Sequence, residues 1–217
     1  MRIVVLGAPG AGKGTHCSRI AEKYGVAHLS SGDILRRERA EGTELGRKAQ
    51  SYMDSGTLVP DDLIVEMMSK ATRAAGTAGY VLDGFPRTVN QAKALDESLD
   101  GQDGGIDIVV NLVVDDGVVV ERITGRRSCP ACGAVYHVKN MPPREDGVCD
   151  KDGVALVQRP DDTEEVVNNR LQTYYEQTEP VVEYYKTRRT VHDIDANEDA
   201  DSVADIIFGR LDAVSRP

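Results

Sequence analysis

A glycine-rich loop near the start of the chain has the residue types that bind phosphate. It reads Gly7-Ala8-Pro9-Gly10-Ala11-Gly12-Lys13-Gly14-Thr15. Glycines let backbone N–H groups converge on phosphate oxygens, a helix N-terminus adds partial positive charge, and Lys13 adds a mobile full charge. A turn without a ligand gives no reason for a lysine at a helix start, where the dipole opposes it. We therefore predict a phosphate-binding loop, or P-loop.

Two oxygen-bearing side chains are candidates for a magnesium site near this loop. The usual P-loop has Ser or Thr directly after the lysine, whereas here Gly14 intervenes and Thr15 follows. Asp83 follows a short apolar run, where a carboxylate can hold magnesium-bound water or, alternatively, cap a strand end. We expect Thr15 and Asp83 to contribute to the site through water.

Three cysteines and an aspartate have the spacing of a small zinc site. Cys129 and Cys132 form one pair, and Cys149 and Asp152 form a second pair of the same spacing. Four protein ligands leave no open coordination position, so zinc bound there is structural. The alternatives are His137 as the fourth ligand, or a segment without metal that polar contacts hold together.

The apolar pattern indicates the elements that position these residues. Residues 2–6 predict a buried parallel strand, and residues 13–24 predict a helix that Gly25 ends. Further strands are predicted at residues 80–82, 106–114 and 191–194, and helices at 61–73 and 163–186. Such alternation predicts an α/β protein with three layers, in which helices flank a parallel sheet.

Two segments interrupt this alternation. Residues 30–59 contain polar helical patterns without a strand candidate, and residues 126–163 collect cysteines, prolines and glycines. We interpret both as insertions into the α/β domain.

Length and charge narrow the class of protein. The 217 residues suit one main domain with insertions, and a net charge of −10 repels nucleic acid and anionic membranes. The first apolar run is too short for a signal segment, so we expect a cytoplasmic protein. No interface pattern argues against a monomer.

Further motifs accompany the P-loop along the chain. They are Leu29-Ser30-Ser31-Gly32-Asp33-Ile34-Leu35-Arg36, Leu82-Asp83-Gly84-Phe85-Pro86-Arg87-Thr88 with Gln91, Gly125-Arg126-Arg127, and Arg159-Pro160-Asp161-Asp162. Together these motifs resemble those of the adenylate kinase family. The resemblance implies reversible transfer of the terminal phosphoryl group of ATP to AMP, giving two ADP, with Mg²⁺ and in the service of nucleotide homeostasis.

The resemblance also implies three domains. Residues 1–29, 60–125 and 164–217 correspond to a CORE domain, residues 30–59 to a helical AMP-binding insertion, and residues 126–163 to a LID. Some long-form members resemble this chain in having a zinc-type LID. The two interruptions of the α/β pattern coincide with these insertions.

Site residues follow from the resemblance, position by position. ATP is assigned to Gly10, Ala11, Gly12, Lys13, Gly14, Thr15, Arg122, Arg126, Val135, Tyr136 and, through a backbone carbonyl, Glu198. AMP is assigned to Ser31, Arg36, Met53, Thr57, Leu58, Val59, Gly84, Phe85, Pro86, Arg87, Gln91, Arg159 and Arg170. Arg36 and Arg87 suit a phosphate dianion and Gln91 an adenine edge, although Arg36 and Gln91 taken alone could be surface helix residues.

Positive charge is the expected means of catalysis. An AMP phosphate oxygen is already an anionic nucleophile, so no general base is required. The resemblance assigns the catalytic cations to Lys13, Arg87, Arg122, Arg126, Arg159 and Arg170, of which Arg122 and Arg126 are expected on one helix face. We expect the histidines, His16, His28, His137 and His192, to be structural or exposed, and Cys17 to be a buried apolar residue.

Other functions compete with this interpretation. A related kinase that uses UMP, CMP or GMP shares most of the motifs, although Gln91 and the long zinc-type LID favour AMP. A zinc-ribbon protein with a degenerate P-loop would bind nucleic acid, which the net charge opposes. A switch-type GTPase would need an Asn-Lys-x-Asp segment, which the sequence does not contain.

Overall fold

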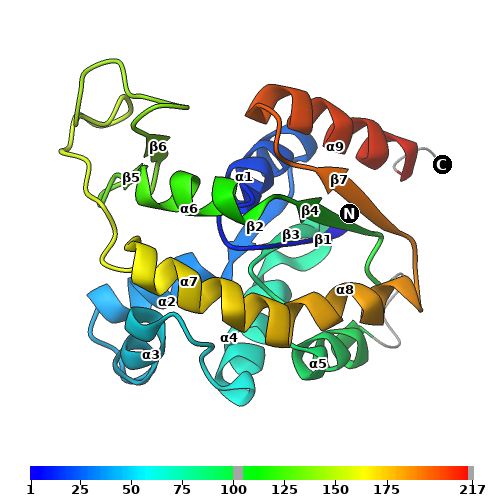
Figure 1. Ribbon diagram of the computed structural model, residues 1–217. Helices are drawn as coiled ribbons and strands as arrows, with labels where there is room; N and C mark the ends of the chain where they lie inside the picture. The colour runs from blue at the N-terminus through cyan, green and yellow to red at the C-terminus, as the bar shows by residue number, and fades with distance from the viewer. Residues whose placement is uncertain (100–104, 215–217) are drawn as a thin grey trace.

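The computed structural model describes residues 1–99 and 105–214, and a parallel sheet forms its centre. Five strands lie in the order β2-β3-β1-β4-β7, and every pair is parallel (Figure 1). The strands are β1 (Arg2–Gly7), β2 (Ala27–Ser30), β3 (Tyr80–Asp83), β4 (Ile108–Val113) and β7 (Val191–Asp195). The prediction of an α/β fold with a parallel sheet is confirmed.

Helices connect the strands and cover both faces of the sheet (Figure 1). They are α1 (Lys13–Tyr24), α2 (Ser31–Ala40), α3 (Glu44–Ser55), α4 (Asp61–Ala75), α5 (Val89–Leu99), α6 (Asp116–Thr124), α7 (Glu164–Thr173), α8 (Glu179–Lys186) and α9 (Ala200–Val214), with a 3₁₀ turn, η1 (Gly76–Ala78). Among the residues described, no helix has the length and apolarity needed to cross a membrane.

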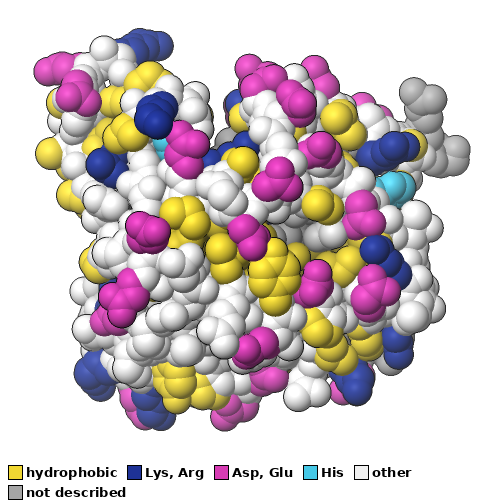
Figure 2. Space-filling model, viewed as in Figure 1, with side chains coloured by type: hydrophobic (Ala, Val, Ile, Leu, Met, Phe, Trp, Pro, Cys, Tyr) yellow, Lys and Arg dark blue, Asp and Glu magenta, His cyan; other side chains and the backbone are white. Residues whose placement is uncertain are grey.

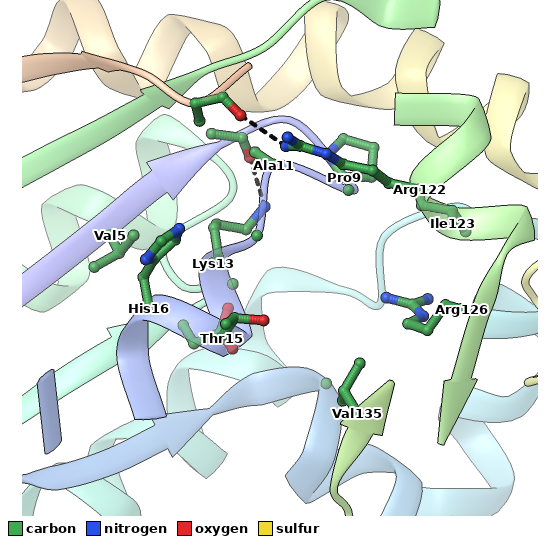
Figure 3. A pocket seen from close by; sticks show the side chains of 18 of the residues that line it. Val5, Pro9, Ala11, Lys13, Thr15, His16, Arg122, Ile123, Arg126 and Val135 are labelled. Carbon is green, nitrogen blue, oxygen red and sulfur yellow. Dashed lines mark hydrogen bonds between the residues drawn. The ribbon is translucent and has the colours of Figure 1, made fainter. Parts of the chain in front are cut away.

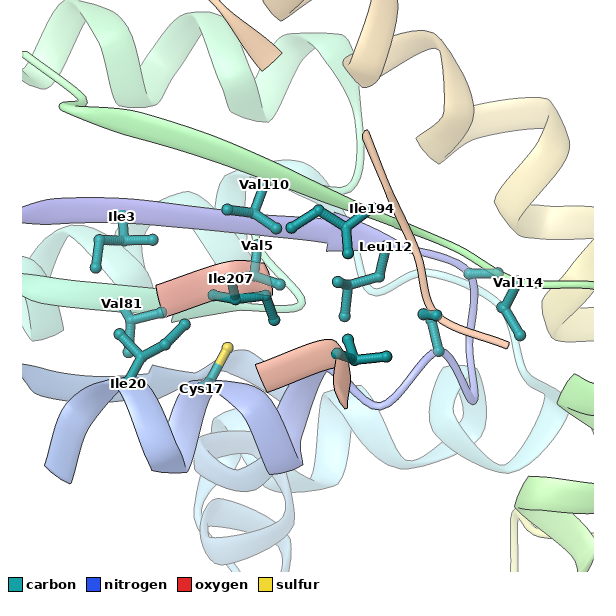
Figure 4. Packing of buried hydrophobic residues seen from close by; sticks show 14 of the residues in the cluster. Ile3, Val5, Cys17, Ile20, Val81, Val110, Leu112, Val114, Ile194 and Ile207 are labelled. Atoms are coloured by element: carbon teal, nitrogen blue, oxygen red, sulfur yellow. The ribbon is translucent and has the colours of Figure 1, made fainter. Parts of the chain in front are cut away.

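The central strand β1 separates two apolar clusters. Ile3 and Val5 pack on the side of α1 and α9, which Figure 4 shows, whereas Val4 and Leu6 pack on the side of α4, α5 and α8. These side chains are almost fully buried, and each contributes about 1.5–3 kcal/mol to the free energy of unfolding. Two covered faces explain why the strand is apolar at every position.

The sheet register gathers polar residues at the carboxyl ends of three strands. Val5 of β1 pairs with Asp83 of β3, and Asp83 also pairs with Ser30 of β2. The P-loop begins at the last residue of β1, Gly7, and α2 begins directly after β2. Open parallel sheets bind ligands at this edge.

The two predicted interruptions add helices and a small second sheet to the described structure. Residues 30–59 form α2 and α3, and the short strand β2 before them was not predicted. The segment 126–163, which we call the cysteine segment, projects from the sheet in Figure 1 and contains the antiparallel pair β5 (Arg126–Ser128) and β6 (Val135–His137).

Two helix predictions need correction. The single helix predicted at 163–186 is interrupted by a π-helical turn, η2 (Tyr174–Thr178), before α8 begins with a proline in its first turn. Arg122 and Arg126 do not share a helix face, because α6 ends at Thr124 and Arg126 begins β5. Gly125 caps the end of α6, so the chain turns between the two arginines.

Candidate active site

The P-loop wraps around the start of α1 and forms one wall of a large cavity. Gly10 and Gly12 have φ angles of 77° and 87°, and a Cβ atom on Gly10 would lie 3.1 Å from Ile123 Cγ1. Lys13 Nζ donates hydrogen bonds to the Gly7 and Ala8 carbonyl oxygens, each at 2.7 Å. Burial lowers the pKa of Lys13 to about 8.

The large cavity has a volume of about 770 Å³ and opens between the cysteine segment and α9. Figure 2 shows the hollow there, with Lys or Arg side chains visible inside it, and Figure 3 shows the wall beside the P-loop. All the residues predicted for ATP line it: Gly10, Ala11, Gly12, Lys13, Gly14, Thr15, Arg122, Arg126, Val135, Tyr136 and Glu198.

Arg122 ties α6 to the loop that follows β7. Its guanidinium donates to the carbonyl oxygens of Ala196 at 2.7 Å, Asn197 at 3.2 Å and Glu198 at 3.3 Å. The backbone at Glu198 therefore faces the cavity beside an arginine, which fits the role predicted for a carbonyl near this position.

Three more arginines occupy the junction between the cysteine segment and α7. Arg126 pairs with the fully buried carboxylate of Asp162, and Arg170 Nη1 lies 3.2 Å from Asp161 Oδ2. Burial, together with nearby arginines, lowers the pKa of Arg159 and Arg170 to about 10. These arginines form a dense positive cluster that two aspartates partly neutralise.

A second, smaller cavity of about 80 Å³ adjoins the first. Residues predicted for AMP line it: Ser31, Arg36, Met53, Thr57, Leu58, Val59, Gly84, Arg87, Gln91 and Arg170. Pro86 and Arg159 line the larger cavity instead. Phe85 is buried in the apolar cluster that includes residues of α4 and α5. Arg36, Arg87 and Arg170 line both cavities.

A hydrogen-bond network orients Gln91, which is 1% exposed. Gln91 Oε1 accepts from the Arg87 backbone N–H at 2.7 Å, and Gln91 Nε2 donates to Asp61 Oδ1 at 2.8 Å. Thr88 Oγ1 donates to the other Asp61 oxygen at 2.9 Å. Gln91 is therefore not a surface residue. Asp61 was not predicted as a site residue, because an acidic residue at a helix start has an ordinary dipole explanation.

Hydrogen bonds to nearby residues orient Ser31, Arg36 and Arg87 in the smaller cavity. Ser31 Oγ and Arg87 Nε both donate to the Gly84 carbonyl oxygen, at 2.6 and 2.7 Å. Arg36 Nη2 donates to Asp33 Oδ1 at 2.5 Å. Burial lowers the pKa of Arg87, so its charge lies in a poorly solvated position that an anion would stabilise.

The predicted magnesium residues lie close to the P-loop. Thr15 and Asp83 both line the larger cavity, and a Cβ atom on Gly14 would lie 3.4 Å from Asp83 Oδ2. His28 Nε2 lies 3.3 Å from the same carboxylate oxygen. His28 was predicted to be structural or exposed, without a role in the site.

The four predicted zinc ligands come together in the cysteine segment. Ligand atoms of Cys129, Cys132, Cys149 and Asp152 all lie within 4.8 Å of one another, a set of soft and anionic donors that suits zinc. His137 is not part of the cluster, because its Nδ1 accepts from Lys139 N and Asn140 N, each at 3.0 Å.

Two further residues connect to these sites. The Tyr136 hydroxyl lies 3.5 Å from Cys149 Sγ and accepts from Asp150 N at 2.9 Å, while the residue also lines the larger cavity. His16 is buried beside the P-loop, where burial lowers its pKa to about 4 and keeps the ring neutral at pH 7.

Comparison with known proteins identifies the family. The family model for adenylate kinase matches residues 5–190. The chain belongs to the adenylate kinase family. The adenylate kinase of Lachnospira eligens is 47% identical over 204 residues, 94% of this chain and 96% of the relative. That of Archaeoglobus fulgidus is 48% identical and covers 94% of both chains, and that of Clostridium tetani is 45% identical over 99% of this chain and 100% of its own.

Membership of the adenylate kinase family confirms the resemblance predicted from the motifs. The match spans the P-loop, the smaller cavity and the cysteine segment within one fold. A zinc-ribbon protein with a degenerate P-loop is therefore not supported, since the cysteine segment is part of an adenylate kinase chain. The cysteine cluster is compatible with a metal site in this context.

Proposed function

We propose that this adenylate kinase family member transfers the terminal phosphoryl group of ATP to AMP, giving two ADP. The observation that carries the proposal is the pair of adjoining cavities, one with a P-loop and one with an oriented glutamine, with Arg36, Arg87 and Arg170 lining both. Donor and acceptor bound in such neighbouring cavities would meet among these arginines.

The larger cavity is the proposed ATP site. The N–H groups of the P-loop donate to the phosphate oxygens, and the Lys13 ammonium exchanges the Gly7 and Ala8 carbonyls for phosphate oxygens. Arg122, Val135 and the carbonyl at Glu198 contact the rest of the nucleotide. A phosphate beside Lys13 favours its charged form, which opposes the effect of burial on the pKa.

The smaller cavity is the proposed AMP site, and the enclosing backbone at 57–59 shapes it. Arg36 and Arg87 hold the AMP phosphate, for which a guanidinium offers paired donors. Gln91 reads the adenine edge with its remaining donor and acceptor, because Asp61 and the Arg87 N–H already fix the orientation of the amide.

Catalysis in this proposal rests on alignment and charge. The phosphate oxygen of AMP attacks without a base, and Lys13, Arg87, Arg122, Arg126, Arg159 and Arg170 stabilise the charge on the transferring group. Residues 126–163 act as a LID that closes over residues 30–59 and over the CORE. The CORE consists of residues 1–29, 60–125 and 164–217, and a part of it lies outside the described residues. Closure of the LID excludes water that would otherwise hydrolyse ATP.

Two metals fit the residues present. Asp83 and Thr15 offer oxygen donors beside the P-loop, as magnesium requires, and Mg²⁺ bound with ATP would neutralise phosphate charge. Cys129, Cys132, Cys149 and Asp152 would hold a structural Zn²⁺ that stabilises the LID. We also propose a cytoplasmic monomer that binds neither nucleic acid nor membranes, in line with the net charge of −10.

The test is a comparison of acceptors. Purified protein with Mg²⁺ and ATP is mixed separately with AMP, GMP, CMP and UMP, and the diphosphates are quantified. The proposal expects ADP formation with AMP to exceed transfer to each other acceptor. Preference for another nucleotide would make the chain a different nucleoside monophosphate kinase, and transfer to none would refute the enzyme function.

A further inference from the structure

Cys17, His28 and Asp83 form a second group of metal-ligating side chains, separate from the cysteine segment. The Cys17 sulfur, an imidazole nitrogen and a carboxylate oxygen all lie within 4.8 Å of one another. The three residues come from α1, β2 and the carboxyl end of β3, so the fold brings them together. Figure 4 shows the Cys17 sulfur pointing from α1 toward the sheet.

The group is accessible from the nucleotide cavity on one side only. Cys17 is fully buried, whereas the side chains of His28 and Asp83 are 22% and 13% exposed. His28 and Asp83 line the larger cavity. A cation that enters from the cavity therefore meets the imidazole and the carboxylate first, with the thiol behind them.

Ser18 lies at the Nδ1 side of the His28 ring and Asp83 at the Nε2 side. Ser18 Oγ donates to the Gly14 carbonyl oxygen at 2.9 Å and lies 3.3 Å from His28 Nδ1, so it can accept from this nitrogen in the tautomer with a proton on Nδ1. In that tautomer Nε2 presents a lone pair. Nε2 lies 3.3 Å from Asp83 Oδ2, so two electron-rich atoms face each other unless a proton or a cation lies between them.

The spacing suits a cation. Zinc lies about 2.0–2.2 Å from nitrogen and oxygen ligands, which places such ligands about 3.3 Å apart in a tetrahedron. The Ser18 contact at Nδ1 is the outer hydrogen bond that orients metal-binding histidines. A thiolate selects zinc over magnesium, and three protein ligands leave a fourth position open to the cavity.

We propose that Cys17, His28 and Asp83 bind a thiophilic divalent cation such as Zn²⁺, and that this binding inhibits phosphoryl transfer. The Cys17 thiol releases its proton to solvent as the sulfur binds the metal. Inhibition rests on the proposed function, since the bound cation takes the Asp83 carboxylate away from magnesium-bound water and places two positive charges beside the P-loop.

The site itself is tested by counting metal, without any measurement of activity. Protein is dialysed against buffered free Zn²⁺, and zinc per chain is measured. We expect two zinc ions in the wild type, one in Cys17→Ala, one in Cys132→Ala, which lacks a ligand in the cysteine segment, and none in the double variant. Circular dichroism verifies that each variant is folded, and Cys17→Ser repeats the test with a side chain of similar size.

Two results would overturn the site. One zinc ion in the wild type that Cys132→Ala lacks would mean that a proton, and not a metal, bridges His28 and Asp83. Two zinc ions in Cys17→Ala would mean that the thiol is not a ligand.

Inhibition is tested with protein whose cysteine segment already holds zinc. Free Zn²⁺ is raised at constant excess Mg²⁺–ATP, and each protein is compared with its own rate before the addition. Wild-type activity should fall as the second zinc binds, and Cys17→Ala should need at least about tenfold more Zn²⁺. Identical curves would overturn the inhibition. If the protein transfers no phosphate with Mg²⁺ alone, the proposed function fails while the zinc count still decides the site.

Discussion

Asp61 Oδ1 accepts a hydrogen bond of 2.8 Å from Gln91 Nε2, so a carboxylate at the start of α4 sets the orientation of the amide in the smaller cavity. In Asp61→Ala the amide loses this partner, and a hydrogen bond to a charged group contributes about 1.5–3 kcal/mol. We expect the KM for AMP to rise about tenfold or more, with a smaller change in kcat. Steady-state kinetics with varied AMP measures both constants.

Asp62→Ala is the matched control for this variant. Asp62 is the other acidic residue in the first turn of α4, and it is exposed. Both substitutions remove a favourable charge from the helix start, but only Asp61 contacts Gln91. An equal rise in KM in the two variants would contradict the positioning role of Asp61.

Lys13→Met removes the only side-chain charge that the P-loop contributes to the ATP site. Loss of one donor to a developing anionic charge costs about 10²–10³-fold in kcat. We expect a decrease of at least that size in the rate of ADP formation. Lys93→Met, on the exposed face of α5, is the control and should keep the wild-type rate. A decrease of less than tenfold would show that Lys13 is not essential.

The pH dependence of ATP capture should reveal the lowered pKa of Lys13. Burial lowers this pKa from 10.5 to about 8, so the free protein loses the Lys13 charge as the pH rises through 8. We expect kcat/KM for ATP, which reports the free enzyme, to fall above pH 8. A pH profile in which kcat/KM stays constant from pH 7 to 10 would contradict a role for the Lys13 charge in capturing ATP.

Removal of zinc from the cysteine segment should lower thermal stability. Each kcal/mol lost shifts the melting temperature of a protein of this size by about 2–4 °C. We expect a lower Tm in wild-type protein treated with a strong chelator, measured by scanning calorimetry. Cys132→Ala should have the lower Tm without treatment and should respond less to the chelator, because only zinc at Cys17, His28 and Asp83 is left to remove. A chelator effect of equal size in both proteins would rule out zinc at this cluster.

The sequence indicated the central fold and most of the residues that line the two cavities, because their signals are local. An apolar run followed by glycines and a lysine predicts strand, loop and helix in any context, and β1 and α1 follow it. Strand β2 was missed because Ala27–Ser30 is short and half-buried, so it lacks the apolar pattern of a covered strand.

Contacts between segments that are far apart in the sequence could not be predicted from local patterns. Arg126 was predicted on a helix face with Arg122, but its position depends on Asp162, a buried partner from the far end of the cysteine segment. His28 was given no role because only the register of β2 beside β3 brings it to Asp83. Cys17 was predicted to be a buried apolar residue, and its burial is confirmed, but its neighbours His28 and Asp83 were not foreseen.

Arg126 and Arg170 already pair with Asp161 and Asp162, so an anion must compete with these carboxylates to bind the arginines. Chloride or a single sulfate that enters the cavity meets arginines whose charge Asp161 and Asp162 already partly neutralise. A ligand with several phosphates can engage these arginines together with Lys13 and so replace both aspartates at once. We therefore expect the protein to discriminate among anions by their valence and span.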